Sequence, residues 1–290
     1  MLQPWNSNKP PLGARLNPSH PLAKGLVGCW LMNEGGGGKL FDLSGKNNTG
    51  TITNALWTSG KFGSCLSFDG NDDYAQITDN ATLRFGTGDF AVSAWFNYAG
   101  VDSSGYSNII SKGRTGDAEW FMDVFTNFVR FYAGNTMVVG SSGATSVSTN
   151  TWYNVIATRN GSNGYIYLNG LLKATDTSSS VDLSTTKNIK IGVNTEVTDR
   201  DFNGKIDDVK IYNYALTPSQ IKQLYTEPYC MFQKPLRRNI NYTAITGKNM
   251  KINISDSWRD VADLKINVGD SWRSVVGVKK NVGDSWKTVF

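Results

Sequence analysis

A chain of 290 residues, 39% of them hydrophobic and 12% aromatic, is long enough to bury one large core and to carry a small appendage. Thirty glycines, abundant Ser, Thr and Asn, and few strongly helical stretches exclude a mainly helical protein and predict an all-β one. The net charge of +5 is unevenly placed, because residues 229–290 alone carry +6. Such a basic end could meet nucleic acid, a membrane surface or an acidic protein, or could be ordinary solubilising charge.

The amino-terminal residues lack the charged start and apolar run of a signal peptide, and no stretch approaches the ~18 apolar residues of a membrane span. We therefore expect a soluble protein that does not follow the general secretory route. The chain has three cysteines, Cys29, Cys65 and Cys230. We predict buried thiols, with a Cys29–Cys65 disulfide as the alternative if these two residues lie on paired strands.

The first 24 residues hold five of the eight prolines and show no alternation of apolar residues. Proline fixes its backbone and donates no hydrogen bond, so residues 1–24 are predicted to form an extended arm outside any sheet. Such an arm is either free or lies along a neighbouring surface.

Short strands and tight turns are predicted from residue 25 to residue 228. In the segment "GLVGCWLMNE" (25–34) both alternating sets of residues are apolar, as in a strand buried on both sides. In "FAVSAWFNY" (90–98) one set is more apolar and the other more polar, as in a strand packed on one side. Asn169-Gly170 lies between two β-forming runs, which indicates a two-residue hairpin. Further strands are predicted at residues 65–77, 128–132, 152–160, 164–174 and 189–193. Strands at this spacing predict an antiparallel jelly-roll sandwich.

One short helix is predicted at "LTPSQIKQLY" (216–225). Thr217 can cap it, Pro218 suits its first position, and Ile221, Leu224 and Tyr225 form an apolar stripe that would dock on the sandwich. A basic segment that includes Pro235 follows, so residues 229–248 are predicted to be a linker between the sandwich and a carboxy-terminal module at residues 249–290.

Several motifs in the predicted sandwich resemble a known family. "GLVGCWLMNEGGGGKLFDLSGKNNTGTI", "LSFDGNDDYAQI", "FAVSAWF", "TWYNVIATRNGSNGYIYLNG" and "FNGKIDDVKIYNYALTPSQIKQLY" are similar to the laminin-G-like jelly roll of the concanavalin A-like lectin/glucanase superfamily. The resemblance covers roughly residues 22–228. It implies two antiparallel sheets curved over each other, with a concave face that some members use for sugar.

The resemblance also implies a structural calcium ion as cofactor. The matching residues are Asp42, Asp207 and, less closely, Asp69. Calcium needs about six to eight oxygen ligands, which acidic residues at strand ends and loop carbonyls can supply. The alternative is that Asp42 and Asp69 shape turns through bonds to the backbone, and that Asp207 accepts hydrogen bonds from loop amides.

Some relatives hydrolyse glycans with paired carboxylates, and Glu119 and Asp123 are the nearest pair here. The tighter cluster of three acids typical of those relatives is absent, and the single histidine, His20, lies in the proline-rich arm. We therefore predict a protein that is not an enzyme. Trp95 and Trp120 are candidate platforms for stacking a sugar ring, with ordinary core tryptophans as the alternative.

The last 41 residues contain three copies of one motif with a period of fourteen, "MKINISDSWRDVAD", "LKINVGDSWRSVVG" and "VKKNVGDSWKTVF". A two-residue loop at Gly269-Asp270 would make each copy a hairpin. In the second copy this register places Lys265 opposite Ser274, Ile266 opposite Arg273, and Asn267 opposite Trp272.

Short hairpins of this size cannot enclose a core of their own, so the module is predicted to pack on the sandwich, on identical modules in an oligomer, or on another protein. Stacking of sugars on the tryptophan row is a rival use. The predicted assembly interface comprises Trp258, Trp272, Trp286, Lys265, Leu264, Ile266 and Val268.

Repeats of this style after a jelly roll resemble the ends of bacteriophage structural proteins. This second, weaker resemblance implies a non-catalytic virion protein, assembled in the host cytoplasm as a capsid decoration, head fibre or tail-associated subunit. Its expected partners are other virion proteins, further copies of itself and host surface glycans, with no membrane and no nucleic acid, because no nucleic-acid-binding motif is recognisable. The alternative is a free carbohydrate-binding protein.

Overall fold

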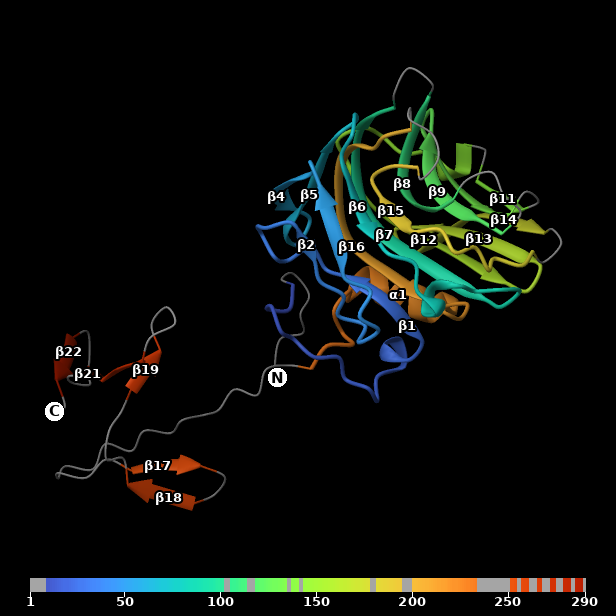
Figure 1. Cartoon of the computed structure of the whole chain (residues 1–290). Coiled ribbons are helices and arrows are strands. Elements are labelled where there is room, and N and C mark those ends of the chain that lie inside the picture. Colours follow the sequence, from blue (N-terminus) through green and yellow to red (C-terminus); the bar gives the residue numbers. More distant parts are fainter. Residues whose placement is uncertain are drawn as a thin grey trace. The chain divides into compact units, whose positions relative to one another are not determined.

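The computed structural model divides the chain into two compact units, residues 1–234 and 235–290 (Figure 1). In the first unit it describes residues 9–101, 105–113, 118–134, 137–140, 143–177, 181–194 and 200–233. In the second unit it describes the backbone of residues 251–254, 257–260, 265–267, 272–274, 279–282 and 285–288.

The first unit is a sandwich of two eight-stranded sheets in which every strand pair is antiparallel. We call one of them the back sheet. Its order is β14 (Leu171–Thr177), β13 (Asn163–Leu168), β12 (Trp152–Asn160), β7 (Phe90–Gly100), β16 (Asn203–Tyr212), β5 (Gly63–Asp69) and β4 (Leu56–Gly60), and β1 (Leu26–Trp30) pairs with the end of β16.

The other is the front sheet. Its order is β11 (Met137–Val139), β10 (Phe128–Ala133), β9 (Trp120–Phe125), β8 (Tyr106–Lys112), β15 (Ile189–Ile191), β6 (Tyr74–Ile77), β3 (Gly50–Thr53) and β2 (Lys39–Leu40). Three short 3₁₀ helices, η1 (Pro21–Ala23), η2 (Ala81–Leu83) and η3 (Gly143–Thr145), lie in the connections. The predicted all-β jelly-roll sandwich is confirmed.

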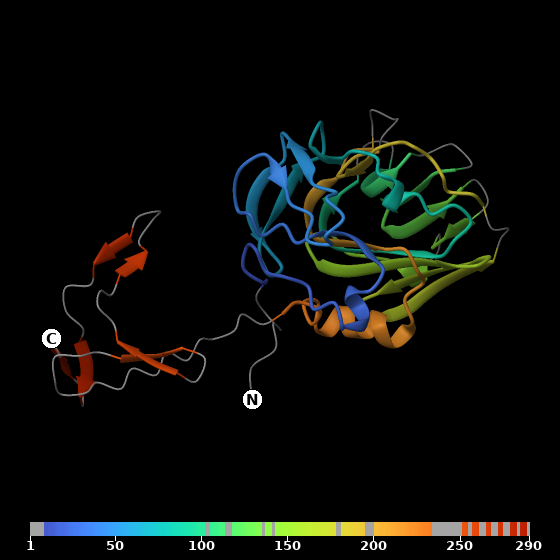
Figure 2. The same ribbon diagram turned by 60° about the horizontal axis from the view of Figure 1, so that its bottom comes forward.

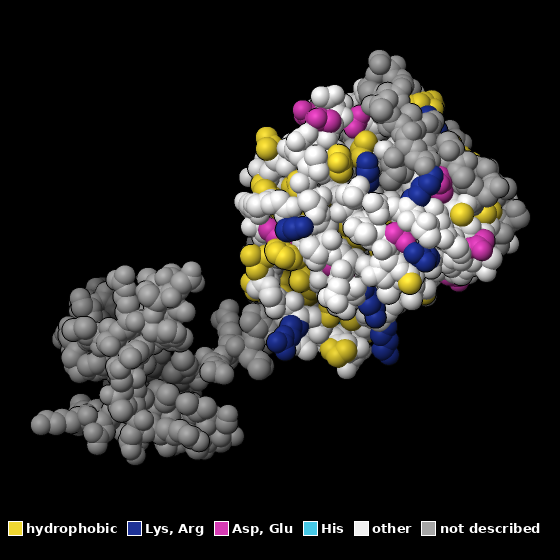
Figure 3. All heavy atoms as spheres, in the orientation of Figure 1, with side chains coloured by type: hydrophobic (Ala, Val, Ile, Leu, Met, Phe, Trp, Pro, Cys, Tyr) yellow, Lys and Arg dark blue, Asp and Glu magenta, His cyan; other side chains and the backbone are white. Residues whose placement is uncertain are grey.

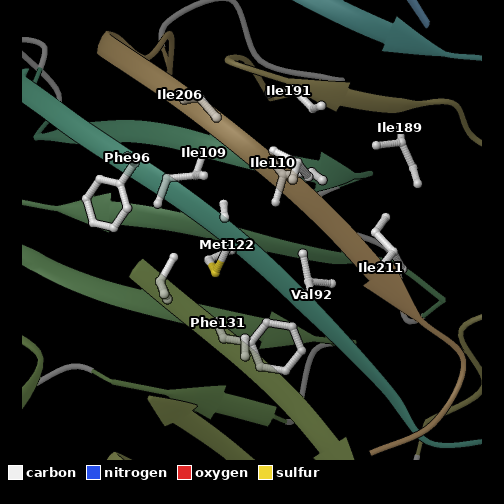
Figure 4. Packing of buried hydrophobic residues seen from close by; sticks show 14 of the residues in the cluster. Val92, Phe96, Ile109, Ile110, Met122, Phe131, Ile189, Ile191, Ile206 and Ile211 are labelled. Atoms are coloured by element: carbon white, nitrogen blue, oxygen red, sulfur yellow. The ribbon is translucent and has the colours of Figure 1, made fainter. Parts of the chain in front are cut away.

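Alternate residues of each strand form the core between the sheets. Val92 and Phe96 of β7 meet Met122 of β9 and Phe131 of β10 there (Figure 4). Because successive side chains of a strand point to opposite faces, the residues between them must lie on the outer faces. The outer faces are therefore where the two sheets can differ.

The outer face of the back sheet is covered by the chain itself (Figure 2). Helix α1 (Pro218–Thr226) begins with a capping box between Thr217 and Gln220, as its sequence predicts, and it buries Ile221 and Leu224. A second apolar cluster joins α1, the amino-terminal arm and the segment after the helix, through Leu22, Leu26, Leu216, Met231 and Phe232 among others.

The proline-rich arm is not free over its described part. Leu16 forms a β-bridge with Phe232, and the amide of Asn17 donates a hydrogen bond to the Met231 carbonyl. The predicted linker at 229–248 therefore needs a correction at its start, because Tyr229, Met231 and Phe232 are buried in the first unit. Their apolar side chains outweigh the basic character that suggested a linker.

Two local predictions are confirmed. Asn169 and Gly170 have φ values of 51° and 75°, as a two-residue hairpin between β13 and β14 requires. All three cysteines are free thiols; Cys29 and Cys65 are buried as predicted, whereas Cys230 is only partly buried, and burial raises the pKa of Cys65 to about 12. Cys29 and Cys65 lie on β1 and β5, which both pair with β16 and not with each other, so the condition for a disulfide is not met.

The second unit contains three hairpins, β17–β18 (Lys251–Ile254, Ser257–Asp260), β19–β20 (Lys265–Asn267, Trp272–Ser274) and β21–β22 (Lys279–Val282, Ser285–Thr288). The register in the middle hairpin is the predicted one, and each hairpin places an Asn opposite its Trp. Leu264 and Val268 lie outside the described residues. None of the helices in the described part of the chain has the length and apolarity that a membrane crossing needs.

Candidate functional site

Of the three aspartates predicted to bind calcium, Asp42 shapes a loop. Its carboxylate accepts hydrogen bonds from the amides of Cys29, Ser44 and Asn48 and from the Ser44 hydroxyl, at 2.8–3.0 Å. This is the structural alternative that the sequence left open. Both oxygens of the carboxylate are engaged in fixing the loop between β2 and β3 and in tying it to β1.

Asp207 lies on the outer face of the back sheet, where its side chain is fully buried. One carboxylate oxygen pairs with Lys9 of the arm, and the other accepts a hydrogen bond from the Lys61 amide at 3.1 Å. A carboxylate neutralised by a buried ammonium group is a poor calcium ligand. The structure therefore does not bring Asp42, Asp207 and Asp69 together as a metal site.

Asp69 lies in a different environment, at the end of β5. Ligand atoms of Asp69, Asp72 and Asp73 lie within 4.8 Å of one another. Burial raises the pKa of Asp73, and the charges of Asp69 and Asp72 act in the same direction. These three carboxylates have the oxygen chemistry that calcium takes, so the calcium prediction is now confined to this group.

The two tryptophans predicted to stack on sugar are both buried in cores. Trp95 is 4% exposed on the outer face of the back sheet, where its ring stacks on Tyr225 of α1 at 5.7 Å. Trp120 is fully buried between the sheets, close to Phe85 and Phe90. Neither ring offers a free face, so both are core tryptophans.

The carboxylate pair considered for hydrolysis is occupied by cations. Asp123 of β9 receives two hydrogen bonds from Arg130 of β10, from Nε at 3.0 Å and from Nη2 at 2.6 Å. Glu119 pairs with Lys187. Carboxylates held by separate cations lack the free acid and base that glycoside hydrolysis needs.

The same part of the molecule has a feature that the sequence did not reveal. Trp120, Met122 and Val124 of β9 belong to the core, so Phe121, Asp123 and Phe125 lie on the outer face of the front sheet. The neighbouring strands place further polar and aromatic groups there. We call this surface the front strip; it comprises Tyr106 and Asn108 of β8, Phe121, Asp123 and Phe125 of β9, and Arg130 and Tyr132 of β10.

Arg130 is the centre of the front strip. Its guanidinium carbon lies 4.4 Å from the ring centre of Phe125, 5.2 Å from that of Tyr106 and 5.1 Å from that of Tyr132. Its Nη1 also donates to the Tyr132 hydroxyl at 3.2 Å. Burial acts to lower the pKa of Arg130, but the bonds and charge of Asp123 hold it above its ordinary value. The group is a permanent, fixed cation.

Aromatic rings surround this cation. Phe121 stacks on Tyr132 with ring centres 4.4 Å apart, and Tyr106 lies against Phe125 at 4.7 Å. A second guanidinium, that of Arg200, lies 3.4 Å from the ring centre of Tyr106. Tyr106, Phe125 and Tyr132 are each partly exposed, so the rigid cluster presents aromatic surface to solvent.

Asn108 is the unusual member of the front strip. It lies opposite Asp123 in the β8–β9 ladder and is 0% exposed. Neither its amide nitrogen nor its amide oxygen makes a hydrogen bond within the part of the chain that the structure describes. Leaving such a group unpaired costs about 1–3 kcal/mol, and an ordered buried water is the usual partner of such an amide in a folded protein.

Sequence reasoning missed this site for a specific reason. The segment "FVRFY" (128–132) predicts a strand with Phe128, Arg130 and Tyr132 on one face, and that signal was present. Its meaning depends on which strands lie beside it, and the bulge between Asn108 and Ile110 of β8 sets the register of the neighbour. No periodicity in β8 alone reveals the bulge.

The charges on the face visible in Figure 3 are interspersed, with Lys and Arg beside Asp and Glu and no large patch of one sign. A fixed Arg–Asp pair, partly exposed rings and an unpaired amide are therefore the distinctive chemistry of the front strip. The partly exposed rings offer flat apolar surface, and the phenol groups of Tyr106 and Tyr132 add polar edges to it. This combination fits a neutral, hydroxyl-rich ligand.

Residues 69–222 match the Concanavalin A-like lectin/glucanases superfamily. The chain belongs to this superfamily. No curated protein sequence matches the chain.

Solved structures of similar fold include several binding domains. The binding domain of Paraclostridial Mosquitocidal Protein 1 has a TM-score of 0.60 and 16% identity, and the match covers 92% of this chain and 74% of that one. Domain 4 of AbnA, an extracellular arabinanase of Geobacillus stearothermophilus solved with arabinotriose, has a TM-score of 0.52 and 22% identity over 69% of this chain and 98% of that one.

The binding domain of botulinum neurotoxin serotype D has a TM-score of 0.56 and 17% identity. The match covers 70% of this chain and 51% of the toxin domain, so the superfamily member described here spans about half of that relative. Trypanosoma rangeli sialidase has a TM-score of 0.56 and 18% identity, over 76% of this chain and 37% of the sialidase. At these identities the likeness concerns the fold.

Proposed function

We propose that this protein is a non-catalytic carbohydrate-binding protein whose ligand lies on the front strip. The observation that carries the proposal is the set of partly exposed rings of Tyr106, Phe125 and Tyr132 held around the fixed Arg130 cation. The apolar face of a sugar ring can pack on these rings, and its hydroxyls can bind at their polar edges. Comparable folds in toxin binding domains and in the arabinanase domain solved with arabinotriose support this class of ligand.

The absence of catalysis is part of the proposal. Asp123 and Glu119 are each held by a cation, and hydrolysis would need one of them as a free acid and a second carboxylate as a base or nucleophile. We expect no cleavage of any glycan that binds, measured by product analysis after long incubation. Cleavage that disappears in Glu119→Gln would revive an enzymatic function.

The direct test of binding is a glycan array followed by calorimetry, with arabinan oligosaccharides and sialylated glycans among the probes. Tyr132→Ala and Tyr106→Ala are expected to weaken the best ligand about tenfold each, because each removes a stacking face. Phe41→Ala is the matched control, since Phe41 is an exposed aromatic residue outside the front strip. Equal losses in all three variants, or no binding by the native chain, would exclude the front strip.

We further propose that the second unit fastens the protein to a larger assembly, and that this assembly is a virus particle carrying host-directed binding proteins. The support is the repetition itself: three hairpins of one register, each with Asn opposite Trp. Deletion of residues 249–290 should convert an oligomer into a monomer that still binds glycan, measured by light scattering. A native chain that is already a monomer, or its absence from purified particles of a viral source, would contradict the attachment role.

Calcium stays a prediction for the Asp69 group alone. Binding there should raise the unfolding temperature when calcium is added after EDTA treatment, because a ligand of the native state stabilises it. Asp72→Asn with Asp69→Asn should remove that shift.

A further inference from the structure

A buried lysine of the amino-terminal arm contacts the back sheet. The Lys9 side chain is 5% exposed, and its Nζ donates to the carbonyls of Met32 and Ser64 and pairs with Oδ1 of Asp207, which is fully buried. The two paired residues are 198 positions apart in the chain. Amine and carboxyl groups of distant segments are thus held in contact away from solvent.

The local backbone places Asp207 there. The ladder of β16 with β7 shifts register between Asp207 and Lys210, and Asp208 at this bulge has a φ of 49°. The bulge lets Ile206 and Val209 both enter the core while Asp207 remains on the outer face. The space is tight, since a Cβ atom at Gly60 would lie 2.6 Å from Asp207 Oδ2.

We propose that Lys9 and Asp207 condense to form an amide bond, a covalent lactam that locks the arm to strand β16. Charge and atoms balance without any oxidant, reductant or further reactant. The ammonium group passes one proton to the carboxylate, and the resulting amine attacks Cγ of the carboxyl group. The N–C bond forms, the C–OH bond breaks, and the hydroxyl leaves as water with the second proton of the attacking nitrogen.

Physical conditions at the pair favour this step. A buried ion pair carries a desolvation cost that a neutral amide does not, so condensation removes two buried charges. Groups held in a reactive orientation reach effective concentrations of about 10⁵–10⁸ M. So high an effective concentration favours condensation over hydrolysis, which the excess of water favours in solution. Burial also raises the pKa of Asp207 to about 6, against the influence of Lys9, which keeps a reactive acid form accessible near neutral pH.

We assign the proton transfers to a further carboxyl group, that of Glu34. Glu34 interacts electrostatically with Lys9, and its Oε2 is buried without a hydrogen-bond partner among the described residues. Burial raises the pKa of Glu34. The adjacent Asn33 holds the arm in place by donating to the Pro10 carbonyl at 2.7 Å.

Two other buried lysine–carboxylate pairs lack these features. Lys112 shares Asp79 with Arg84. Burial acts to raise the pKa of Asp79, but the hydrogen bonds from these two cations hold that pKa below its ordinary value, so Asp79 stays a carboxylate. Lys210 and Asp208 are neighbours on one strand, so a bond between them would fasten no separate segment. Only the Lys9–Asp207 pair, among these three, joins the arm to the sheet.

Intact-mass spectrometry under denaturing conditions tests the proposal. The folded native chain is expected to be about 18 Da lighter than its sequence mass, the loss of one water, with a branched peptide that contains both Lys9 and Asp207 after proteolysis. Lys9→Arg and Asp207→Ala should show the full sequence mass. Lys24→Arg, a change at an exposed lysine of the same arm, should keep the loss.

Two variants remove ambiguity about folding and about other dehydration reactions. Asp207→Asn keeps the shape of the side chain and should lose about 17 Da, because ammonia leaves in place of water. Glu34→Gln should slow the mass change without altering the circular dichroism spectrum, and Glu34→Asp should restore part of the rate. A folded native chain that keeps its full mass after prolonged incubation, or a loss that persists in Lys9→Arg, would overturn the proposal.

Discussion

The two outer faces of the sandwich carry similar kinds of residue but differ in their exposure to solvent. Each has a charged pair beside an aromatic ring: Asp208 and Lys210 near Tyr229 on the back sheet, and Asp123 and Arg130 near Tyr132 on the front sheet. The back face is covered by α1, the arm and residues 229–232, whereas rings on the front face stay partly exposed. The chain covers the back face with its own segments, whereas on the front face the rings of Tyr106, Phe125 and Tyr132 reach solvent above a buried Arg130–Asp123 pair.

The two faces differ in exposed aromatic surface and not in the pairing of polar groups. On the back face, each carboxylate and ammonium group of the Lys9–Asp207 and Lys210–Asp208 pairs has a partner from the chain itself. Trp95 Nε1 and the Tyr229 hydroxyl of that face, like the Asn108 amide of the front face, are buried without a hydrogen-bond partner among the described residues. An unpaired buried polar group therefore does not by itself mark a ligand site.

The largest effect is expected from breaking the charged pair of the front strip. Asp123→Ala leaves the Arg130 cation buried and unpaired, which should lower the free energy of unfolding by about 3–5 kcal/mol. Replacing both members, Asp123→Leu with Arg130→Met, should restore most of that stability and still abolish glycan binding. Urea unfolding and calorimetry measure the two quantities. A double variant as unstable as the single one would make the pair structural.

On the back face, a comparable loss of stability should leave binding untouched. Leu224→Ala removes a buried side chain of α1 from the apolar cluster and should cost about 2–5 kcal/mol of unfolding free energy. Lys222→Ala, an exposed position of the same helix, is the control and should change little. Glycan affinity measured below the unfolding transition should be equal in both variants. Weaker binding by folded Leu224→Ala would mean that the two faces are coupled.

Asn108→Leu should change stability and leave binding nearly unchanged. The leucine fills a similar volume without two unpaired polar atoms, so the unfolding free energy should rise by about 1–3 kcal/mol. Glycan affinity should change little, because the Asn108 side chain is fully buried. Thermal unfolding and calorimetry on the same sample test both. A destabilised variant would show that the amide supports the fold.

The smallest change in stability is expected from the cap of helix α1, which covers part of the back face. Thr217→Ala removes the cap of α1 and should cost about 1 kcal/mol, with no change in glycan affinity. Thr217→Ser, which keeps the capping hydroxyl, should retain most of the stability. A loss well above this estimate in Thr217→Ala would indicate that α1 folds only while docked.

Elements with a local signal could be predicted from the sequence, and contacts between distant elements could not. The start of α1 at Thr217 and Pro218 and the hairpin turn at Asn169-Gly170 are determined by neighbouring residues, and the structure has both as predicted. Trp95 was misplaced as a glycan platform because alternation gives the face of a strand without saying which face a helix will cover. Tyr225, 130 positions away in sequence, covers it.

The candidate site illustrates the same limit. Glu119 and Asp123 were identified as a pair from their spacing, but Lys187 and Arg130, which occupy them, come from other strands and loops. Strand order decides which cation pairs with each carboxylate. The environment of Asn108 depends in addition on one bulge in β8. Such information is a property of the assembled sheet.

The most direct test of the central claim is a nuclear magnetic resonance titration of the native chain with the glycan that binds best on the array. If the glycan lies on the front strip, the backbone signals of Tyr106, Arg130 and Tyr132 shift together and saturate at one dissociation constant. Signals of α1 on the back face should stay in place. Shifts confined to the back face, or saturable binding that leaves the front-strip signals unchanged, would exclude the front strip as the binding site.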